Sequence, residues 1–229
     1  MNNSDIYRKA LALDPLTEGE ALQIYRSAPL AELMLAADAL RREQAGDPQV
    51  VTWQIDRNVN ITNVCISGCK FCNFHCKPHQ SDKAYITTIE EYDAKIRETL
   101  ALGGDQLLLQ GGLHPKLDIV FYEELFRELK RRFPQLRLHA LGAPEVAHIA
   151  RISRLDPETV LLRLIAAGLD SLPGAGAEIL DNGVRRAISP GKPDADRSDA
   201  HCAQTEPAYL GDDDVRPSRN PAATDRTPD

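Results

Sequence analysis

The sequence predicts an α/β fold in which parallel strands alternate with crossover helices. From Asn58 onward, short apolar or β-branched segments alternate four times with amphipathic helical segments. Such alternation is typical of an α/β barrel or a doubly wound sheet. The strand–helix connections QGGLHPKL, ALGAPE and SLPGAGAE carry most of the Gly, Pro, His and Glu residues. In both architectures ligands bind at that edge, where the carboxyl ends of the strands lie.

Capping residues and periodicity place the expected elements in order. Capping boxes at Thr17 and Thr88 each open a helix, and Asp118 caps another. The first box begins a helical stretch, and the second begins a helix that stops at Gly103. The other expected helices are 30–44, 118–133, 144–153, 157–167 and 177–188. β-Branched or apolar runs predict strands at 50–55, 58–61, 106–110, 136–141 and 169–172.

These elements divide the chain into three segments. Residues 1–49 form a helical N-terminal segment, residues 50–189 form the β-α core, and residues 190–229 form a tail. A closed barrel needs about eight strands, so four repeats predict a partial, TIM-like barrel. The tail holds 5 Lys and Arg against 9 Asp and Glu, with few large aliphatic residues. We therefore expect it to be disordered, either as a natural acidic tail or as the product of a reading-frame error.

Composition excludes several classes of function. The chain has 229 residues, is 42% hydrophobic and carries a net charge of −7. That charge argues against binding to nucleic acid or an anionic membrane, because phosphate contacts need a basic face. The N-terminus shows no secretory signal, and no apolar run is long enough to span a bilayer. We expect a cytoplasmic protein with a small-molecule substrate.

Four of the five cysteines lie within a single loop, which is the strongest chemical signal in the sequence. Cys65, Cys69 and Cys72 follow the first strand of the core, and Gly68 permits a tight turn between two of them. Three thiolates on one loop can hold an iron–sulfur cluster that leaves one iron open. Three alternatives compete: buried structural cysteines, a disulfide, and a zinc site built from Cys69, Cys72, Cys76 and His79.

The spacing Cys65-x3-Cys69-x2-Cys72, with Phe71 before the last cysteine, resembles the signature of the radical S-adenosylmethionine (SAM) superfamily. The segments RNVNITNVCISGCKFCNF, LLLQGGLHP, LHALGAPEVAHIA and GLDSLPGAGAEIL extend the likeness over residues 5–193. They resemble the subgroup that contains cyclic dehypoxanthinyl futalosine synthase, aminofutalosine synthase and the deazaflavin-cofactor synthase subunits. DSLPGAGAEIL and HALGAPE are most similar to the first of these, which belongs to the futalosine route to menaquinone.

The resemblance implies a radical SAM barrel with a 4Fe–4S cluster and SAM as cofactors. Its cluster ligands are Cys65, Cys69 and Cys72. It also implies a cofactor-binding set made of Phe71 near the adenine, the turn at the end of the second strand, and a glutamate at a helix start. These residues are Phe71, Gln110, Gly111, Gly112 and Glu145. For Glu145, stabilisation of a helix N-terminus is the competing interpretation.

Several polar residues near the strand ends keep open roles. His114 faces the substrate or is solvated, His139 lies on the third strand, and Ser171, Gly174 and Glu178 lie around the fourth strand end. Glycines there can bring backbone N–H groups toward a polar ligand.

The reaction implied by the resemblance is intramolecular. A 5′-deoxyadenosyl radical takes hydrogen from dehypoxanthine futalosine, and the carbon radical closes onto the benzoate ring to give a spiro-cyclic product. A low-potential electron donor is implied as a partner. The likeness stops near residues 194–197, in mid-helix. We therefore favour a frameshift or truncation there, with a chain that folds poorly alone or survives as an inactive iron–sulfur or zinc fragment.

Overall fold

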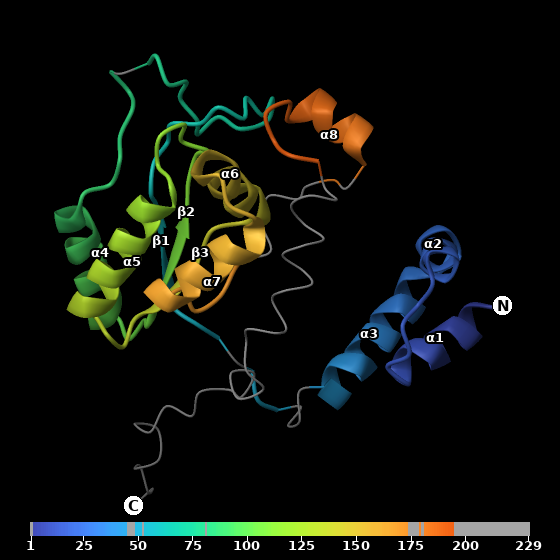
Figure 1. The fold of residues 1–229 in the computed structure, drawn as a ribbon. Coiled ribbons are helices and arrows are strands. Elements are labelled where there is room, and N and C mark those ends of the chain that lie inside the picture. The colour runs from blue at the N-terminus through green and yellow to red at the C-terminus, as the bar shows by residue number, and fades with distance from the viewer. Residues whose placement is uncertain are drawn as a thin grey trace, which may run out of the picture. The chain divides into compact units, whose positions relative to one another are not determined.

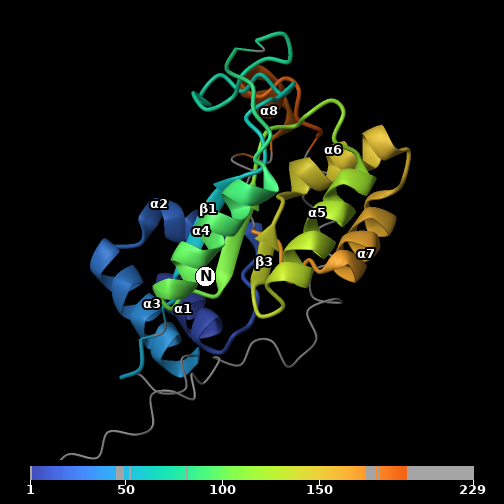
Figure 2. The same ribbon diagram turned by 90° about the vertical axis from the view of Figure 1, so that its left-hand side faces the viewer.

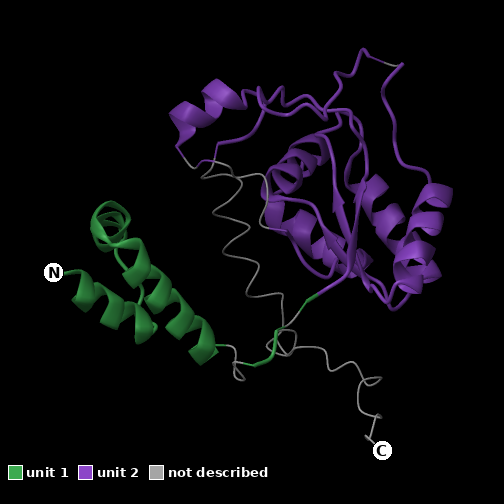
Figure 3. Cartoon of the chain, turned by 180° about the vertical axis from the view of Figure 1, so that it is seen from behind, with its two compact units in different colours: residues 1–53 green, residues 54–229 purple. Residues whose placement is uncertain are grey.

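The protein is described by a computed structural model that covers residues 2–44, 49–51, 53–80, 82–173, 179 and 181–194. The chain divides into two compact units, Met1–Trp53 and Gln54–Asp229 (Figure 3). Among the described residues, no helix is long and apolar enough to cross a membrane.

The first unit consists of helices α1 (Asn3–Leu11), α2 (Glu18–Ser27) and α3 (Leu30–Gln44). The predicted capping box at Thr17 is confirmed, because its side chain accepts from the Glu20 amide. The sequence reasoning missed α1, although Asn2 and Asp5 form a capping box there as well. A salt bridge of 2.8 Å between Lys9 Nζ and Glu20 Oε2 ties α1 to α2.

The second unit is built on three parallel strands, β1 (Asp56–Asn60), β2 (Gln106–Gln110) and β3 (Arg137–Ala140), in that order. Residue Asn60 pairs with Gln110, and Leu108 pairs with His139. Since each crossover contains a helix, the parallel arrangement predicted from β-α alternation is confirmed. The long connection after β1 and the last helix, α8, lie beyond the same end of the sheet (Figure 1).

The helices of this unit, among its described residues, are α4 (Ile89–Ala101), α5 (Ile119–Arg132), α6 (Ala143–Ser153), α7 (Pro157–Ala167) and α8 (Asn182–Ile188). The expected caps are in place, because Thr88 accepts from the Glu91 amide and Asp118 accepts from the amides of the first turn of α5. Each cap satisfies backbone donors that the helix itself leaves without partners.

One face of the sheet carries the hydrophobic core. Val59, Leu107, Leu109, Leu138 and Ala140 form a single buried cluster with residues from α4, α5, α6 and α7. These four helices lie alongside the strands (Figure 1 and Figure 2). A doubly wound sheet has helices on both faces, so a core built on one face favours part of a barrel wall.

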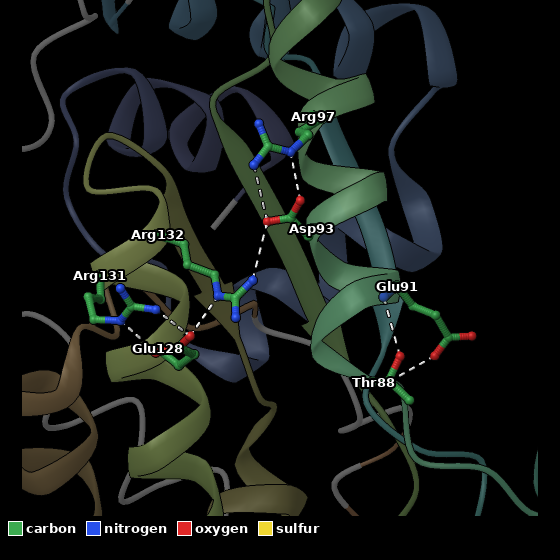
Figure 4. A network of polar contacts seen from close by, with 7 residues as sticks. All are labelled: Thr88, Glu91, Asp93, Arg97, Glu128, Arg131 and Arg132. Carbon is green, nitrogen blue, oxygen red and sulfur yellow. Dashed lines mark hydrogen bonds and ion pairs between the residues drawn. The ribbon is translucent and has the colours of Figure 1, made fainter.

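A polar network joins α4 to α5 on their outer surfaces (Figure 4). Asp93 accepts from Arg97 at 2.6 Å on its own helix and lies 3.6 Å from Arg132 on α5. Arg132 also pairs with Glu128 at 2.6 Å. Exposed pairs of this kind contribute little each, so the apolar cluster provides most of the stability of the helix layer.

Three sequence predictions need correction. Residues 50–55 form no strand at the described positions, because β-branched composition makes a strand only where a partner strand exists. The expected strand 169–172 is reduced to one parallel bridge, between His139 and Ser171. The last helix begins at Asn182 rather than at 177, and residues 177, 178 and 180 lie outside the described residues.

Candidate functional site

The cysteine loop is held in a closed shape by backbone pairing at its two ends. The Cys65 amide donates to the Cys76 carbonyl at 2.9 Å, and the Cys76 amide donates to the Asn63 carbonyl at 2.9 Å. The Asn63 side chain accepts from the Tyr85 amide at 3.0 Å and donates to the Lys83 carbonyl. The loop therefore closes on itself at the carboxyl end of β1.

Within this loop the three predicted cluster ligands follow a tight turn. Gly68 has φ +63°, so the glycine predicted from the spacing occupies the left-handed region that other residues disfavour. The Cys72 amide donates to the Cys69 carbonyl at 3.3 Å. Cys69 is buried, whereas Cys65 and Cys72 are half-buried. All four described cysteines are free thiols, which contradicts the disulfide alternative.

Neighbouring polar groups contact the sulfurs. The Ser67 amide donates to Cys65 Sγ at 3.4 Å, and the Ser67 hydroxyl lies 2.9 Å from Cys69 Sγ. Burial raises the pKa of the Cys65 thiol, hydrogen bonds from the backbone at Ser67 and Leu113 lower it, and the nearby Cys69 and Cys72 raise it. The effect of Cys69 and Cys72 on Cys65 shows that both lie close to it.

A zinc site was the metal-binding alternative to a cluster for these cysteines. Within the part of the chain that is described, no group of three or more His, Cys, Asp or Glu side chains is arranged to hold a metal ion. The zinc alternative with Cys69, Cys72, Cys76 and His79 needs four ligands at one point. The Cys76 thiol instead donates to Asn63 Oδ1 at 3.4 Å.

The Gly111-Gly112 turn at the end of β2 lies directly against the cysteine loop. The Gly112 amide donates to the Thr62 carbonyl at 2.8 Å. A Cβ at Gly112 would overlap with the carbonyl of Val64, and one at Gly111 would lie 3.1 Å from the Thr62 backbone. The resemblance implies that this turn binds a cofactor, and in the structure its glycines allow close approach to the cysteine loop.

Glu145, at the start of α6, joins the ends of two strands. One carboxylate oxygen accepts from the Gly111 amide at 2.9 Å, and the other accepts from the Gly142 amide. Burial raises the pKa of Glu145 to about 7, although both amides and the nearby Lys192 oppose the rise. The helix-cap interpretation of Glu145 is therefore correct in part, because one of its two contacts reaches β2 rather than α6.

Residues 188–192 pack over the cysteine loop, which the sequence reasoning missed by starting the tail at residue 190. The Lys70 amide donates to the Ile188 carbonyl and the Gly191 amide donates to the Ser67 carbonyl, both at 2.8 Å. A Cβ at Gly191 would lie 2.6 Å from the Ser67 Cα. The Lys192 ammonium lies 5.9 Å from the ring centroid of Phe71, which is 53% exposed.

A cavity of about 480 Å³ borders the loop and the start of the tail. Its walls come from the cysteine loop, the Gly111-Gly112 connection, α6 and the segment after α8, and they comprise Ile66, Leu113, Ala147, His148, Arg151, Gly191, Lys192, Pro193 and Asp194. The charged side chains of the wall are Arg151, Lys192 and Asp194, and Asp194 pairs with Arg186 at 2.7 Å.

His114 is half-buried beside this cavity. Its carbonyl lies 2.8 Å from His148 Nε2, and its own ring Nδ1 accepts from the Lys116 amide at 3.1 Å. Burial, with Lys116 and His148 nearby, lowers the pKa of His114. These contacts fix the connection after β2, and they place the imidazole in a local turn.

The structure brings together two residues that the sequence placed on different strands. His139 Nδ1 lies 2.6 Å from Ser171 Oγ. Gly174 and Glu178, which the sequence also singled out, lie outside the described residues.

Comparison with known proteins decides the family. Residues 59–201 match the family model of the Radical SAM superfamily. The matched range includes the cysteine loop, β2, β3 and the end of β1. The chain belongs to the radical SAM superfamily. Members of this superfamily use a 4Fe–4S cluster and SAM.

Curated relatives show which enzymes the chain resembles in sequence. The cyclic dehypoxanthine futalosine synthase of Streptomyces coelicolor is 46% identical over 84% of this chain and 48% of its own length. The enzyme of the same name from Halalkalibacterium halodurans is 37% identical over 82% of this chain and 50% of its own length. The 5-amino-6-(D-ribitylamino)uracil–L-tyrosine 4-hydroxyphenyl transferase of Methanothermobacter thermautotrophicus is 40% identical over 82% of this chain and 50% of its own length. The chain spans about half the length of these relatives.

Solved structures agree on the fold. Methylornithine synthase superposes with a TM-score of 0.63 at 18% identity, over 89% of this chain and 56% of that one. The FeFe-hydrogenase maturase HydG superposes with a TM-score of 0.65 at 16% identity, over 91% of this chain and 44% of that one. The superpositions agree with a partial TIM-like barrel, in which the three-stranded sheet with helices on one face forms part of the wall.

The residues of the cysteine loop fit the family cofactors. A 4Fe–4S cluster takes thiolates as ligands, and it distributes them over different irons, so three neighbouring thiols need not converge on one point. The donor set of Cys65, Cys69 and Cys72 satisfies that requirement on a loop whose backbone is paired at both ends.

Proposed function

We propose that this protein contributes to the conversion of dehypoxanthine futalosine to cyclic dehypoxanthinyl futalosine, in the futalosine pathway of menaquinone biosynthesis. The observation that carries the proposal is the 46% identity to the Streptomyces coelicolor synthase over 84% of the chain. When bound, the cluster and SAM supply a one-electron reduction that yields a hydrogen-abstracting radical. A low-potential electron donor is therefore a required partner.

In this proposal Cys65, Cys69 and Cys72 hold the cluster, and Phe71 with the Gln110–Gly112 turn contacts SAM. Glu145 contributes to the same site by holding the Gly111 amide at 2.9 Å, which fixes the turn beside the loop. The segment 188–192 covers the loop through Lys70 and Ser67, and it would limit the access of water to the cluster.

We also propose the division into an N-terminal helical segment (1–49), a β-α core (50–189) and a tail (190–229). Support for the first boundary comes from the compact units, which separate at Trp53 and Gln54. The proposed disordered and aberrant tail covers residues 190–229, of which 195–229 lie outside the described residues. Residues 190–194 contact the core.

A second candidate is the 4-hydroxyphenyl transferase reaction, because relatives with that name reach 40% identity over a similar length. The two candidates differ in substrate, so one experiment separates them. The chain is reconstituted with iron and sulfide under anaerobic conditions, and SAM cleavage is measured with each substrate. Dehypoxanthine futalosine should stimulate release of 5′-deoxyadenosine and give a cyclic product detected by mass spectrometry.

Stimulation by 5-amino-6-(D-ribitylamino)uracil with tyrosine instead would replace the proposal by the transferase. Iron and sulfide without SAM cleavage would identify an inactive iron–sulfur fragment, and one zinc per chain would identify a zinc-binding fragment. The control is Cys76→Ser, which should keep the cluster, whereas Cys69→Ser should lose it.

A further inference from the structure

The long connection after β1 carries positive charge on an acidic protein (Figure 1). Residues 64–87 contain three lysines and a single acidic residue, Asp82, whereas the whole chain has a net charge of −7. The lysines are Lys70, Lys77 and Lys83, and all three are exposed. None of their ammonium groups forms an ion pair with a described residue. This connection therefore presents positive charge that the described part of the chain does not neutralise.

Asn63 holds two segments of the connection side by side. Its side-chain amide donates to the Lys83 carbonyl at 2.8 Å, and its backbone carbonyl accepts from the Cys76 amide at 2.9 Å. Segments 74–77 and 83–86 therefore flank the same residue. Each segment contributes one exposed lysine, so a partner that contacts both segments meets both charges. Because the contacts use Asn63 and the backbone, changes of the lysine side chains leave them intact.

The same two segments expose apolar side chains. The rings of Phe74 and Tyr85 pack edge to face with 6.5 Å between their centroids, yet these residues remain 43% and 41% exposed. Ile86 is 41% exposed as well. Exposed aromatic side chains accompanied by charged residues are typical of a protein–protein interface. We call Phe74, Lys77, Lys83, Tyr85 and Ile86 the loop face.

The loop face lies next to a predicted cluster ligand. Phe74 is two residues after Cys72 in the sequence. His75 Nδ1 donates to the Cys72 carbonyl at 2.8 Å, and Cys72 itself is half-buried. Electron transfer becomes steeply slower with distance. A redox partner on the loop face would therefore be well placed to reduce a cluster held by the cysteine loop.

Charge and size favour an acidic redox protein over nucleic acid as the partner. A nucleic-acid site neutralises many phosphates and belongs to a basic domain, whereas this chain is acidic and the loop face offers two lysines. Electron-transfer complexes are small, with less than about 1,200 Å² of buried surface. Complementary charge speeds their encounter without requiring high affinity.

We infer that the loop face is the docking surface for an acidic, low-potential electron-transfer protein. This inference deepens the proposed function and rests on it for the need to deliver an electron to the cysteine loop. The docked donor loses one electron and the cluster gains it, and no bond forms or breaks. Lys77 and Lys83 attract the acidic partner, and Phe74 with Tyr85 forms the apolar contact.

The test measures binding rather than turnover. The full chain carrying its cluster is titrated with an acidic flavodoxin by calorimetry, at low and at high ionic strength. Wild-type affinity should fall as salt is added, because salt screens exposed charges. Lys77→Glu combined with Lys83→Glu should weaken binding at low salt by about tenfold and remove most of the salt dependence.

Two further variants separate charge from apolar contact. Lys77→Gln combined with Lys83→Gln removes the positive charge without reversing it, so its affinity should lie between those of wild type and the charge-reversed protein. Phe74→Ala should weaken binding by a similar factor at both ionic strengths, because apolar contact is not screened by salt.

The matched control is Arg26→Glu. Arg26 is exposed on α2, in the other compact unit, and its reversal changes the net charge by as much as Lys83→Glu does. It should leave affinity within about twofold of wild type, because its charge lies outside the loop face. Iron content after reconstitution should be the same in all variants. An effect of Arg26→Glu as large as that of Lys83→Glu would overturn the inference.

The remaining outcomes are equally decisive. The inference is rejected if wild type does not bind flavodoxin at low salt, or if the loop-face variants bind it like wild type. It is also rejected if duplex DNA or vesicles of anionic lipid bind through Lys77 and Lys83 while flavodoxin does not.

An activity assay separates this inference from the proposed function. If flavodoxin docks with the expected dependence but dehypoxanthine futalosine does not stimulate SAM cleavage, the docking surface stands and the proposed function fails. If the cyclic product forms with dithionite as reductant while the loop-face variants bind flavodoxin like wild type, the function stands and the docking surface fails.

Discussion

The two faces of the parallel sheet differ in burial and in polarity. On one face Leu107, Leu109 and Leu138 are fully buried beneath four helices. On the other face Asn60, Gln110 and His139 remain half-buried and polar. Because successive residues of a strand point to opposite faces, one strand supplies both the buried core and a polar face. Residues that are neighbours in the sequence should therefore differ in their contribution to stability.

The largest expected effect comes from the pair of neighbours Leu138 and His139. Leu138→Ala should lower the free energy of unfolding by about 2–5 kcal/mol, because it removes a fully buried side chain from the cluster. His139→Ala should cost about 1 kcal/mol, the value of a typical hydrogen bond. Urea unfolding followed by circular dichroism measures both. Equal losses would show that the two faces do not differ in their contribution to stability.

A smaller effect is expected at the edge where the faces meet the cysteine loop. Gly112→Ala should destabilise the second unit by about 1–3 kcal/mol, because the added Cβ overlaps with the backbone at Val64. Iron content after reconstitution should fall with it, because the loop has to move. The control is Gly19→Ala on α2, where a Cβ meets nothing within 4 Å and helix propensity should improve. Full iron content in Gly112→Ala would contradict the close packing.

The stability of the protein should depend on pH through Glu145. Its pKa rises from 4.5 to about 7 in the folded protein, so the folded state binds more protons than the unfolded state between these values. Stability should therefore fall as pH rises through that window, and Glu145→Gln should flatten the profile there. Unfolding midpoints measured from about pH 4 to 8 test this.

Glu128 on the outer helix layer serves as the control for that profile. Hydrogen bonds from Arg131 and Arg132 lower its pKa to about 2. The stability from Glu128 is present above pH 4.5 and is lost as pH falls toward 2. Glu128→Gln should therefore leave the window between pH 4.5 and 7 unchanged. A change of slope in that window with Glu128→Gln would mean that the pH dependence of stability does not come from Glu145 alone.

The smallest effect is expected on the outer surface of the helix layer (Figure 4). Asp93→Asn weakens contacts with Arg97 and Arg132. It should cost less than about 1 kcal/mol, and the cost should shrink at high salt, because exposed ion pairs are screened. Unfolding at low and high ionic strength measures it. A loss comparable to that of Leu138→Ala would mean that the network, rather than the apolar cluster, joins α4 to α5.

Much of this fold follows from local signals in the sequence. The capping boxes at Thr17 and Thr88 and the cap at Asp118 begin helices where the sequence predicts. The same kind of signal at Asn2 would have revealed α1. The strand at 106–110 has the predicted bounds, whereas the expected strand at 50–55 does not form in the described residues. Caps depend on contacts within one turn, but strands depend on partners distant in sequence.

The candidate site divides in the same way. The sequence alone determined the three-cysteine loop, the turn at Gly68 and the alternation of strands and helices, because each depends on residue type and short spacing. Tertiary structure decided that Glu145 holds Gly111, that residues 188–192 cover the loop, and that His139 meets Ser171. Each of these contacts joins segments more than 30 residues apart, and no spacing rule encodes them, because the relative positions of such segments are set by packing of the whole core.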